Sequence, residues 1–518
     1  MLHANTVMAD LDQTAAPSRL PSAWMALAAA SPFLILFWIN IAHHTMFFDE
    51  VNAWAISAAS PTLPKLFYYV HYEGHPWLWY FILWFPSRLT HDPVAMKWVE
   101  AVLGTAIILI VGLLSPFTLK QRALILSSYF LVWEYTVMCR MYSVMLLLVL
   151  LYVVRRVRKP ESVVLSCALL GLAGNTDMTG VLLSSALLVE YAYSSYFPVA
   201  KAERGAVVRR WIPGLLVYVA LIGLSIATLW PSKDISWQSS GHIGSKAFDF
   251  HRIKHSIVDM IAVPWWPISW KFPQHFWWNE FNDARWLFGL TAIVLVAYWM
   301  TFRKERNLLL LMGATLLFGM VFADVVYDGS PRHWGIAFVS FLVGLWLVSA
   351  RGRDGETRRA SWSPWAYGLL MLSALAGVFA IVGSWIHPFS RAREAAMWVR
   401  QTQPPNLLIT GFADVSFASL AEETQRPVWF LECECSDTFK LFSKEREDFN
   451  PDQIPARLNR ALDILNRQDI LFSMFVPLDD DLVKQMQVAG LQPELLKAFA
   501  GADMKSENFF LYRIRRIH

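Results

Sequence analysis

The sequence predicts an α-helical polytopic membrane protein, with about eleven transmembrane helices, interfacial helices in its first outer loop and a soluble α/β domain at its C-terminus. Apolar residues make up 55% of the 518 residues. Charged residues make up only 17%, whereas soluble domains have roughly a quarter. Trp, which favours membrane–water interfaces, occurs 25 times. The final stretch, residues 387–518, has instead the mixed composition of a globular domain.

Apolar runs long enough to span a membrane, or nearly so, recur from residue 21 to residue 386. The first follows a partly polar stretch and is longer than the apolar core of a signal peptide, so we expect an uncleaved membrane helix. The segment Pro76–Phe85, "PWLWYFILWF", is too short to span upright and is predicted to lie at the interface. The predicted spans are Pro21–Ala42, Val94–Leu114, Ala123–Met138, Met141–Val154, Ser162–Asn175, Gly180–Phe197, Trp211–Trp230, Trp286–Phe302, Asn307–Tyr327, Trp334–Ala350 and Pro364–Ile386.

Basic loops predict the orientation, because Lys and Arg favour the cytoplasmic side. With a cytoplasmic N-terminus, and with residues 76–85 not spanning, every strongly basic loop falls on one side. These loops are Lys120–Arg122, Arg155–Pro160, Lys201–Arg210, Arg303–Arg306 and Arg351–Arg359. The chain then divides into a cytoplasmic tail (1–20), a transmembrane domain (21–386) and an extracytoplasmic α/β domain (387–518). Two large loops, 43–93 and 231–284, lie on the outer face.

The C-terminal domain shows strand and helix patterns in alternation. Strands are predicted at Asn406–Gly411, Pro427–Cys433, Asp469–Pro477 and Phe509–Ile517, and helices at Ile454–Gln468 and Asp480–Gly490. Asp479 or Asp480 is expected to cap the second helix. The spacing of Cys433 and Cys435 seldom permits a good disulfide and is too sparse for a zinc site, so we expect two neighbouring positions on a strand.

Ionisable side chains of the apolar region gather near one membrane boundary. On the predicted topology most lie at outer helix ends or in outer turns, and Glu190 is the main exception. Charge is costly in a membrane, so such groups are candidate functional residues. An enzyme acting on a lipid headgroup would carry them at this level, and a transporter more often at the midplane. The plain alternative is that helix ends tolerate charge. The set is His43, His44, Lys97, Glu100, Glu134, Arg140, Asp177, Asp324, Asp328, Arg332 and His333.

A series of short motifs resembles the GT-C superfamily of polytopic glycosyltransferases, in the bacterial branch related to protein mannosyltransferases, aminoarabinose transferases and Rgt-type transferases. The resemblance covers roughly Pro21 to Ala350. Its motifs are, in order, "FFDEVNAWAIS", "HYEGHPWLWYFILW", "WEYTVMCRMYSVMLLL", "GNTDMTG" and "GSPRHWG". The positions that match the family are Asp49 and Glu50; Glu73, His75 and Pro76; Arg140 and Tyr142; and Arg332 and His333. Trp77 replaces the second Pro of the family's "E-x-H/K-P-P" element.

The resemblance implies transfer of a sugar from a polyprenyl-phosphate donor to an acceptor hydroxyl, on the outer face of the bacterial cytoplasmic (inner) membrane. Asp49 would be the general base. Glu50 would be the alternative general base, or would orient Asp49 and a divalent metal. Arg140 and Arg332 would grip the donor phosphate, since a guanidinium offers two parallel hydrogen bonds. His333 would add a further bond, and Tyr142 would pack on the sugar or bind the phosphate.

The roles of Glu73 and His75 stay open at this stage. With Asp49 they are candidate ligands of a divalent metal, and no other cofactor is expected. Alternatively they hold the loop together or bind the acceptor. Glu134 and Asp177 are predicted to contact substrate or shape loops. His242, His251 and His255 are further candidate ligands, or plain surface histidines.

The aromatic stretch Val263–Phe281 either lines a groove for the polyprenyl chain or anchors the loop in the interface. Two other functions compete with the transferase: a transporter or flippase of a lipid-linked glycan, and a non-catalytic membrane scaffold. The expected partners are the lipid-linked donor, the bilayer and an envelope acceptor, which is a lipid, a polysaccharide or a protein. The residues name neither the sugar nor the acceptor, and no nucleic-acid partner is predicted.

Overall fold

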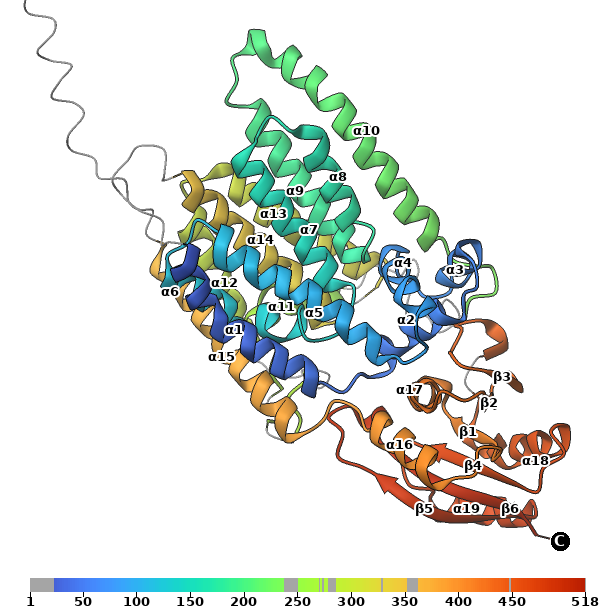
Figure 1. Ribbon diagram of the computed structural model, residues 1–518. Helices are drawn as coiled ribbons and strands as arrows, with labels where there is room; N and C mark the ends of the chain where they lie inside the picture. The colour runs from blue at the N-terminus through green and yellow to red at the C-terminus, as the bar shows by residue number, and fades with distance from the viewer. Residues whose placement is uncertain are drawn as a thin grey trace, which may run out of the picture.

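The computed structural model describes residues 23–517 except 237–249, 270, 273, 278–285, 328, 352–361 and 447–448. The predicted tail 1–20, the candidate ligand His242 and most of the basic loop Arg351–Arg359 lie outside the described residues, and so does the side chain of the candidate ligand His251. A helical bundle forms the N-terminal three quarters of the chain, and a sheet domain lies at one end of it (Figure 1).

Among the described residues, six helical stretches are long and apolar enough to cross a membrane. They are Ala23–His43 (α1), Val94–Leu114 (α5 and the π-helical η2), Lys201–Leu229 (η4 and α10), Arg306–Val325 (α13), Pro331–Arg351 (α14) and Pro364–Ile386 (α15). Shorter helices fill the bundle: α7 (Tyr142–Arg158), α8 (Val163–Ala173), α9 (Met178–Tyr196), α11 (Phe250–Ile261) and α12 (Trp286–Phe302). The membrane-protein class is therefore confirmed, although fewer than the predicted eleven segments are long enough to span alone.

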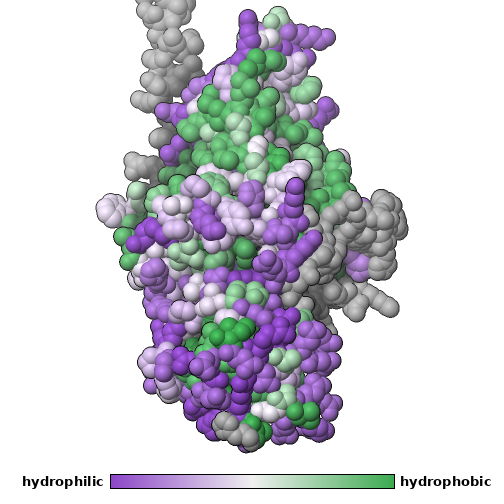
Figure 2. Space-filling view, turned by 90° about the vertical axis from the view of Figure 1, so that its right-hand side faces the viewer, coloured by the Kyte–Doolittle hydropathy of each residue, from purple (hydrophilic) through white to green (hydrophobic). Residues whose placement is uncertain are grey.

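Helix α14 lies at the centre of the bundle, and 83% of its most apolar 18-residue stretch is buried. Helix α10 lies at the edge of the bundle, where it packs mainly on α8 (Figure 1). Its outer side chains, including Leu216 and Val219, are exposed. Figure 2 shows the contrast on one face, where green apolar surface covers much of the helical part and the sheet domain is mostly hydrophilic. The bundle thus has the surface of a lipid-facing domain.

The predicted span Ala123–Met138 is broken in the structure. It consists of α6 (Leu119–Leu126), a π-helical turn η3 (Phe130–Glu134) and an irregular segment that runs to α7. The hydroxyl of Ser127 donates to the carbonyl of Ala123, and Ser128 bonds in the same way to Ile125. Such bonds compete with the helical ladder and often bend the helix. The break leaves Arg140 in a turn rather than on a helix.

The first outer loop contains three short helices, α2 (Phe48–Ala59), α3 (Leu63–Val70) and α4 (Leu78–Trp84), followed by the single turn η1 (Pro86–Arg88). Helix α4 corresponds to the predicted interfacial segment, and at seven residues it cannot cross a membrane. It packs on α2, where the indole of Trp84 donates to the carbonyl of Ser60 at 2.9 Å. This packing holds α2 at the end of the bundle next to the C-terminal domain (Figure 1).

The C-terminal domain is a six-stranded mixed sheet in the order β3-β2-β1-β4-β6-β5. Strand β1 runs parallel to β2 and β4, and the other pairs are antiparallel. The strands are β1 (Ile409–Phe412), β2 (Val428–Phe430), β3 (Cys435–Asp437), β4 (Asp469–Met474), β5 (Leu491–Phe499) and β6 (Phe509–Arg516). The helices are α16 (Ala392–Thr402), α17 (Asp414–Thr424), α18 (Ile454–Ile464) and α19 (Asp480–Val488).

The predicted strands correspond to β1, β2, β4 and β6, and the predicted helices to α18 and α19. Asp479 caps α19, accepting the N–H of Leu482 at 2.7 Å. Strand β5 was not predicted: it is an edge strand that contains Pro493 and many exposed side chains, so it lacks an alternating apolar pattern.

The expectation for Cys433 and Cys435 was wrong, because the two form a disulfide. Glu434 between them has a left-handed backbone (φ 50°), and the chain reverses there from β2 into the antiparallel β3. This reversal brings the two Cα atoms to 5.2 Å, within the range that a disulfide requires.

Candidate active site

A cavity of about 890 Å³ opens at the end of the bundle next to the C-terminal domain, where the loop 43–93 meets α9, α10, α13 and α14. Its wall has two chemical characters. Ionisable groups cover one part: Asp49, Glu73, His75, Arg140, Asp177, Arg332 and His333. Apolar side chains of α9, α10 and α13 cover another: Met178, Val181, Ile226, Leu229, Phe322 and Val326. The cavity therefore suits a molecule with a charged head and a hydrocarbon tail.

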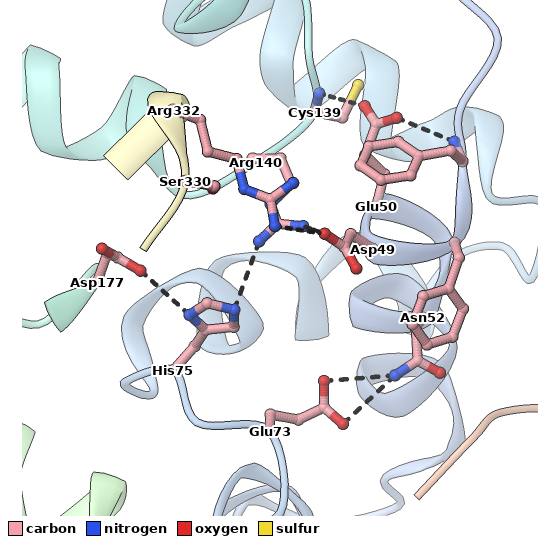
Figure 3. Close-up of polar contacts among 12 residues, drawn as sticks. Asp49, Glu50, Asn52, Glu73, His75, Cys139, Arg140, Asp177, Ser330 and Arg332 are labelled. Atoms are coloured by element: carbon pink, nitrogen blue, oxygen red, sulfur yellow. Dashed lines mark hydrogen bonds and ion pairs between the residues drawn. The ribbon is translucent and has the colours of Figure 1, made fainter. Parts of the chain in front are cut away.

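Asp49 lies at the centre of the polar part, in the first turn of α2. Its Oδ2 is 2.6 Å from Nη1 of Arg140 and 2.9 Å from Nη2 of Arg332 (Figure 3). Burial opposes ionisation of Asp49, but the two guanidinium charges outweigh it and lower the pKa of this carboxyl to about 2. The helix N-terminus favours the carboxylate as well. Asp49 is thus fully ionised at neutral pH.

Arg140 also reaches His75, whose Nε2 is 3.4 Å from Nη2 of the arginine. The other nitrogen of His75, Nδ1, is 3.1 Å from Oδ2 of Asp177. A guanidinium only donates and a carboxylate only accepts, so this pair of contacts fits an imidazole that carries a proton on Nδ1. The Nε of Arg140 is buried and has no hydrogen-bond partner among the described residues. One donor of Arg140 is therefore unpaired within the described part of the chain.

Asp177 links the turn before α9 to this network. It caps α9 by accepting the N–H of Thr179 at 2.8 Å. Burial acts against its charge, but the contact with His75 and other nearby groups hold the pKa of Asp177 well below its usual range. In the same turn Asn175 accepts the indole N–H of Trp77 at 2.7 Å. Trp77, which replaces the second Pro of the family motif, thus joins the loop of His75 to α9.

Glu73 has a different environment from Asp49. Its oxygens accept from Nδ2 of Asn52 at 3.3 Å and from the hydroxyl of Tyr80 at 3.2 Å, both neutral donors. Burial raises the pKa of Glu73 to about 8 despite these bonds. At neutral pH the cavity therefore holds two ionised acids, Asp49 and Asp177, beside one neutral acid, Glu73.

Arg332 and His333 begin the central helix α14. Nδ1 of His333 accepts the backbone N–H of Ser330 at 2.9 Å, which leaves Nε2 as the donor of the ring. Gly329 has φ +72°, and a Cβ there would lie 2.3 Å from the ring of Trp334. This turn requires glycine for both reasons, and it aims the start of α14 at the cavity.

No family model matches the chain, and no curated protein matches it. Two crystal structures of ArnT from Cupriavidus metallidurans are similar to it in fold. The structure bound to undecaprenyl phosphate has a TM-score of 0.53 and 13% identity, and covers 95% of this chain and 98% of that chain. The apo structure has a TM-score of 0.54 and 12% identity, with coverage of 95% and 97%. The chain has the GT-C fold. The fold predicted from the motifs is thereby confirmed over nearly the whole chain.

Within this GT-C fold, Glu50 faces away from the cavity although it follows Asp49 directly. Its carboxylate contacts Nε2 of His44 at 2.8 Å and accepts the N–H groups of Phe47 at 3.0 Å and Cys139 at 2.6 Å. Glu50 therefore ties the end of α1, the start of α2 and the turn that precedes Arg140 to one another. This arrangement makes it a positioning residue.

Two other predicted residues lie behind the cavity wall. Glu134 is buried, where it accepts the hydroxyl of Tyr129 at 2.6 Å and the indole N–H of Trp277 at 3.3 Å. Tyr142 is buried and stacks on Tyr135 with ring centroids 5.0 Å apart. Neither lines the cavity, so both support the residues that do.

The candidate metal ligands Asp49, Glu73 and His75 all line the cavity but do not converge. Both nitrogens of His75 are engaged, and both arginines occupy one oxygen of Asp49. Across the part of the chain that the structure describes, no group of three or more His, Cys, Asp or Glu is arranged to hold a metal. The residues as arranged do not fit a metal, and no chemical step is derived through one.

The apolar lining of the cavity does not come from the aromatic stretch 263–281, none of whose described residues lines it. In that stretch Trp265 and Trp277 are buried in the core, and residues 278–281 lie outside the described residues. Phe442, which lines the cavity from the C-terminal domain, was not predicted, because no local sequence pattern marks it. Asn52 was detectable in principle, because it lies one helical turn after Asp49 and so shares its face of α2.

Proposed function

We propose that this protein is a membrane glycosyltransferase that moves a sugar from a polyprenyl-phosphate donor to an acceptor hydroxyl on the outer face of the bacterial cytoplasmic membrane. One observation carries the proposal: a single cavity joins a centre of two arginines and one aspartate to an apolar wall. The centre suits a phosphate and the wall suits an isoprenoid chain. The likeness in fold to ArnT, whose structure holds undecaprenyl phosphate, supports this donor class.

The donor phosphate would bind Arg140, Arg332 and His333. The acceptor oxygen attacks the anomeric carbon as the bond from that carbon to the phosphate oxygen breaks, so polyprenyl phosphate leaves with the bonding electrons. The arginines stabilise the charge that develops on the phosphate. Asp49 takes the proton of the acceptor hydroxyl as the general base.

The ion pairs of Asp49 give the donor a second role. In the structure both guanidinium groups are bound to Asp49, and a phosphate would compete for the same groups. A bound donor therefore weakens the hold of the arginines on Asp49 and makes its carboxylate more basic. The base becomes effective when the donor is in place, which limits proton transfer in its absence.

We place the C-terminal domain (387–518) outside the membrane, with the stretch 1–20 in the cytoplasm and residues 21–386 as the transmembrane domain. The disulfide Cys433–Cys435 supports this orientation, because disulfides persist in oxidising compartments. The clustering of Lys and Arg in the opposite loops supports it independently.

The test is a transfer assay with purified protein in nanodiscs, a panel of radiolabelled polyprenyl-phosphate sugars and an envelope extract as acceptor. We expect one donor to be consumed by the wild type and not by Asp49→Asn, which keeps the size of the side chain but cannot act as a base. A protein that binds donors and consumes none would instead be a transporter. Full turnover in Asp49→Asn would remove Asp49 from the mechanism.

A further inference from the structure

The C-terminal domain is attached to the helix that carries Asp49. The carboxyl of Glu507 is buried, and its Oε1 accepts the N–H of Phe48 at 2.9 Å. Its Oε2 accepts the hydroxyls of Ser390 at 2.7 Å and Ser419 at 2.9 Å. The C-terminal domain thus holds the first turn of α2, one residue before Asp49.

A second contact lies one turn further along α2. The backbone N–H of Lys440 donates to Oδ1 of Asn52 at 3.0 Å. Asn52 in turn donates from Nδ2 to Glu73. A hydrogen-bonded path therefore runs from the C-terminal domain through Asn52 to the neutral acid of the cavity.

The same segment of the C-terminal domain, residues 439–444, crosses the outer end of the bundle, and we call it the strap. Its ends are fixed: Phe439 packs on Tyr69 with ring centroids 5.0 Å apart, and the N–H of Lys444 donates to the carbonyl of Asp234 at 2.7 Å. The carbonyl of Phe442 accepts the N–H of Ser236 at 2.8 Å. The strap is thus joined to both outer loops.

Between these fixed ends, Phe442 reaches the cavity wall. Its ring lies 6.2 Å from the ring of Phe48, edge to face. Phe48, Phe442, Asn52 and Glu73 make a wall that shares no residue with the apolar wall of α9, α10 and α13. It combines two aromatic rings with hydrogen-bonding groups.

We propose that this second wall is the acceptor subsite, that the acceptor presents a sugar ring to it, and that Phe442 determines acceptor specificity. The proposal rests on the function proposed above, which uses the arginines and the apolar wall for the donor. A sugar ring has an apolar C–H face, which stacks on an aromatic ring, and hydroxyls around its edge, which need hydrogen-bond partners such as Glu73. The side chain of a serine or threonine acceptor has no such face to stack on the ring of Phe442.

The experiment measures transfer from the donor identified above to three acceptors: oligosaccharides released from the envelope and delipidated, the intact envelope glycolipid, and a serine- and threonine-rich peptide. Full-length wild type is compared with Phe442→Ala, and with Phe442→Leu, which keeps apolar bulk without a ring. Phe499→Ala is the matched control, because Phe499 packs on Trp398 in the same domain and does not line the cavity.

We expect the acceptor KM to rise about tenfold in both Phe442 variants, which corresponds to the loss of one aromatic contact. The donor KM and the slow hydrolysis of donor by water should stay within twofold, Phe442→Tyr should restore the acceptor KM, and Phe499→Ala should match wild type. Transfer to both the free oligosaccharide and the glycolipid would mean that the ring is sufficient; transfer to the glycolipid alone would mean that its lipid adds to a site that still depends on Phe442.

Two results would overturn the inference: transfer to the peptide but to neither glycan, or an unchanged acceptor KM in Phe442→Ala and Phe442→Leu. An equal rise of donor and acceptor KM would do the same, since it would indicate a general disturbance of the cavity. A wild-type protein that consumes no donor contradicts the proposed function itself, so the two failures are distinguishable.

Discussion

Replacing Arg140 with alanine tests the phosphate site most directly. The guanidinium of Arg140 is buried, 2.6 Å from Asp49, and its Nε has no partner among the described residues. Its contact with a donor phosphate would be a charge-assisted hydrogen bond, which is worth about 1.5–3 kcal/mol. The dissociation constant for polyprenyl phosphate should therefore rise by about 10- to 150-fold in Arg140→Ala.

The structure also predicts how Arg140 and Arg332 combine. Both bind the same oxygen of Asp49, so removing one guanidinium leaves the other with a stronger hold on the carboxylate. The effects of Arg140→Ala and Arg332→Ala on donor affinity should consequently not add in the double variant. Independent, additive effects would contradict a shared site.

The assay is direct binding of labelled polyprenyl phosphate to protein in nanodiscs, with thermal unfolding measured in parallel. Arg513→Ala is the matched control, because Arg513 pairs with Asp469 on the sheet of the C-terminal domain, away from the cavity. Donor affinity within twofold of wild type in both Arg140→Ala and Arg332→Ala, with folded protein, would refute the assignment of these residues to phosphate.

Two further predictions concern the acids of the first outer loop. The raised pKa of Glu73, about 8, means that its contribution to stability is fully present below its unfolded pKa and is lost as the pH rises through about 8. The unfolding temperature of wild type should fall between about pH 4.5 and about pH 8, and Glu73→Gln should remove part of this fall. The difference between the two proteins isolates Glu73 from Glu422 and Glu507, whose pKa values burial also raises to about 8; parallel curves would contradict the neutral state of Glu73. Glu50→Gln should destabilise the protein by about 1–3 kcal/mol and lower kcat, because a neutral amide weakens the bonds that hold α2 to the turn before Arg140. Lost activity at unchanged stability would instead make Glu50 a chemical participant.

Much of the architecture was readable from the sequence because membrane burial imposes long apolar runs. The same cost of burying charge confines ionisable groups to helix ends, so Asp49, Arg140 and Arg332 could be assigned to one level of the membrane. The structure brings the two arginines to 2.6 Å and 2.9 Å from Oδ2 of Asp49. Helix α4 was predictable from its length alone, as was the Asp479 cap of α19 from local chemistry.

Neighbouring residues with similar chemistry were harder to distinguish. Asp49 and Glu50 look alike in sequence, but successive residues on a helix point about 100° apart. One therefore faces the cavity and the other faces the turn at Cys139. Which acid would face which side depended on how α2 packs, and no local pattern records that.

The membrane class, the gathering of polar groups near helix ends and the residue types of the candidate site could be read from the residues alone, because these follow from burial energies that act residue by residue. Three contacts became known only from the folded structure: the pairing of Asp49 with two arginines, the disulfide between the two cysteines that flank Glu434, and the position of Phe442 in the cavity wall. These contacts join segments through loop paths and backbone turns. Their geometry depends on the packing of the whole chain, which the composition of each segment does not specify.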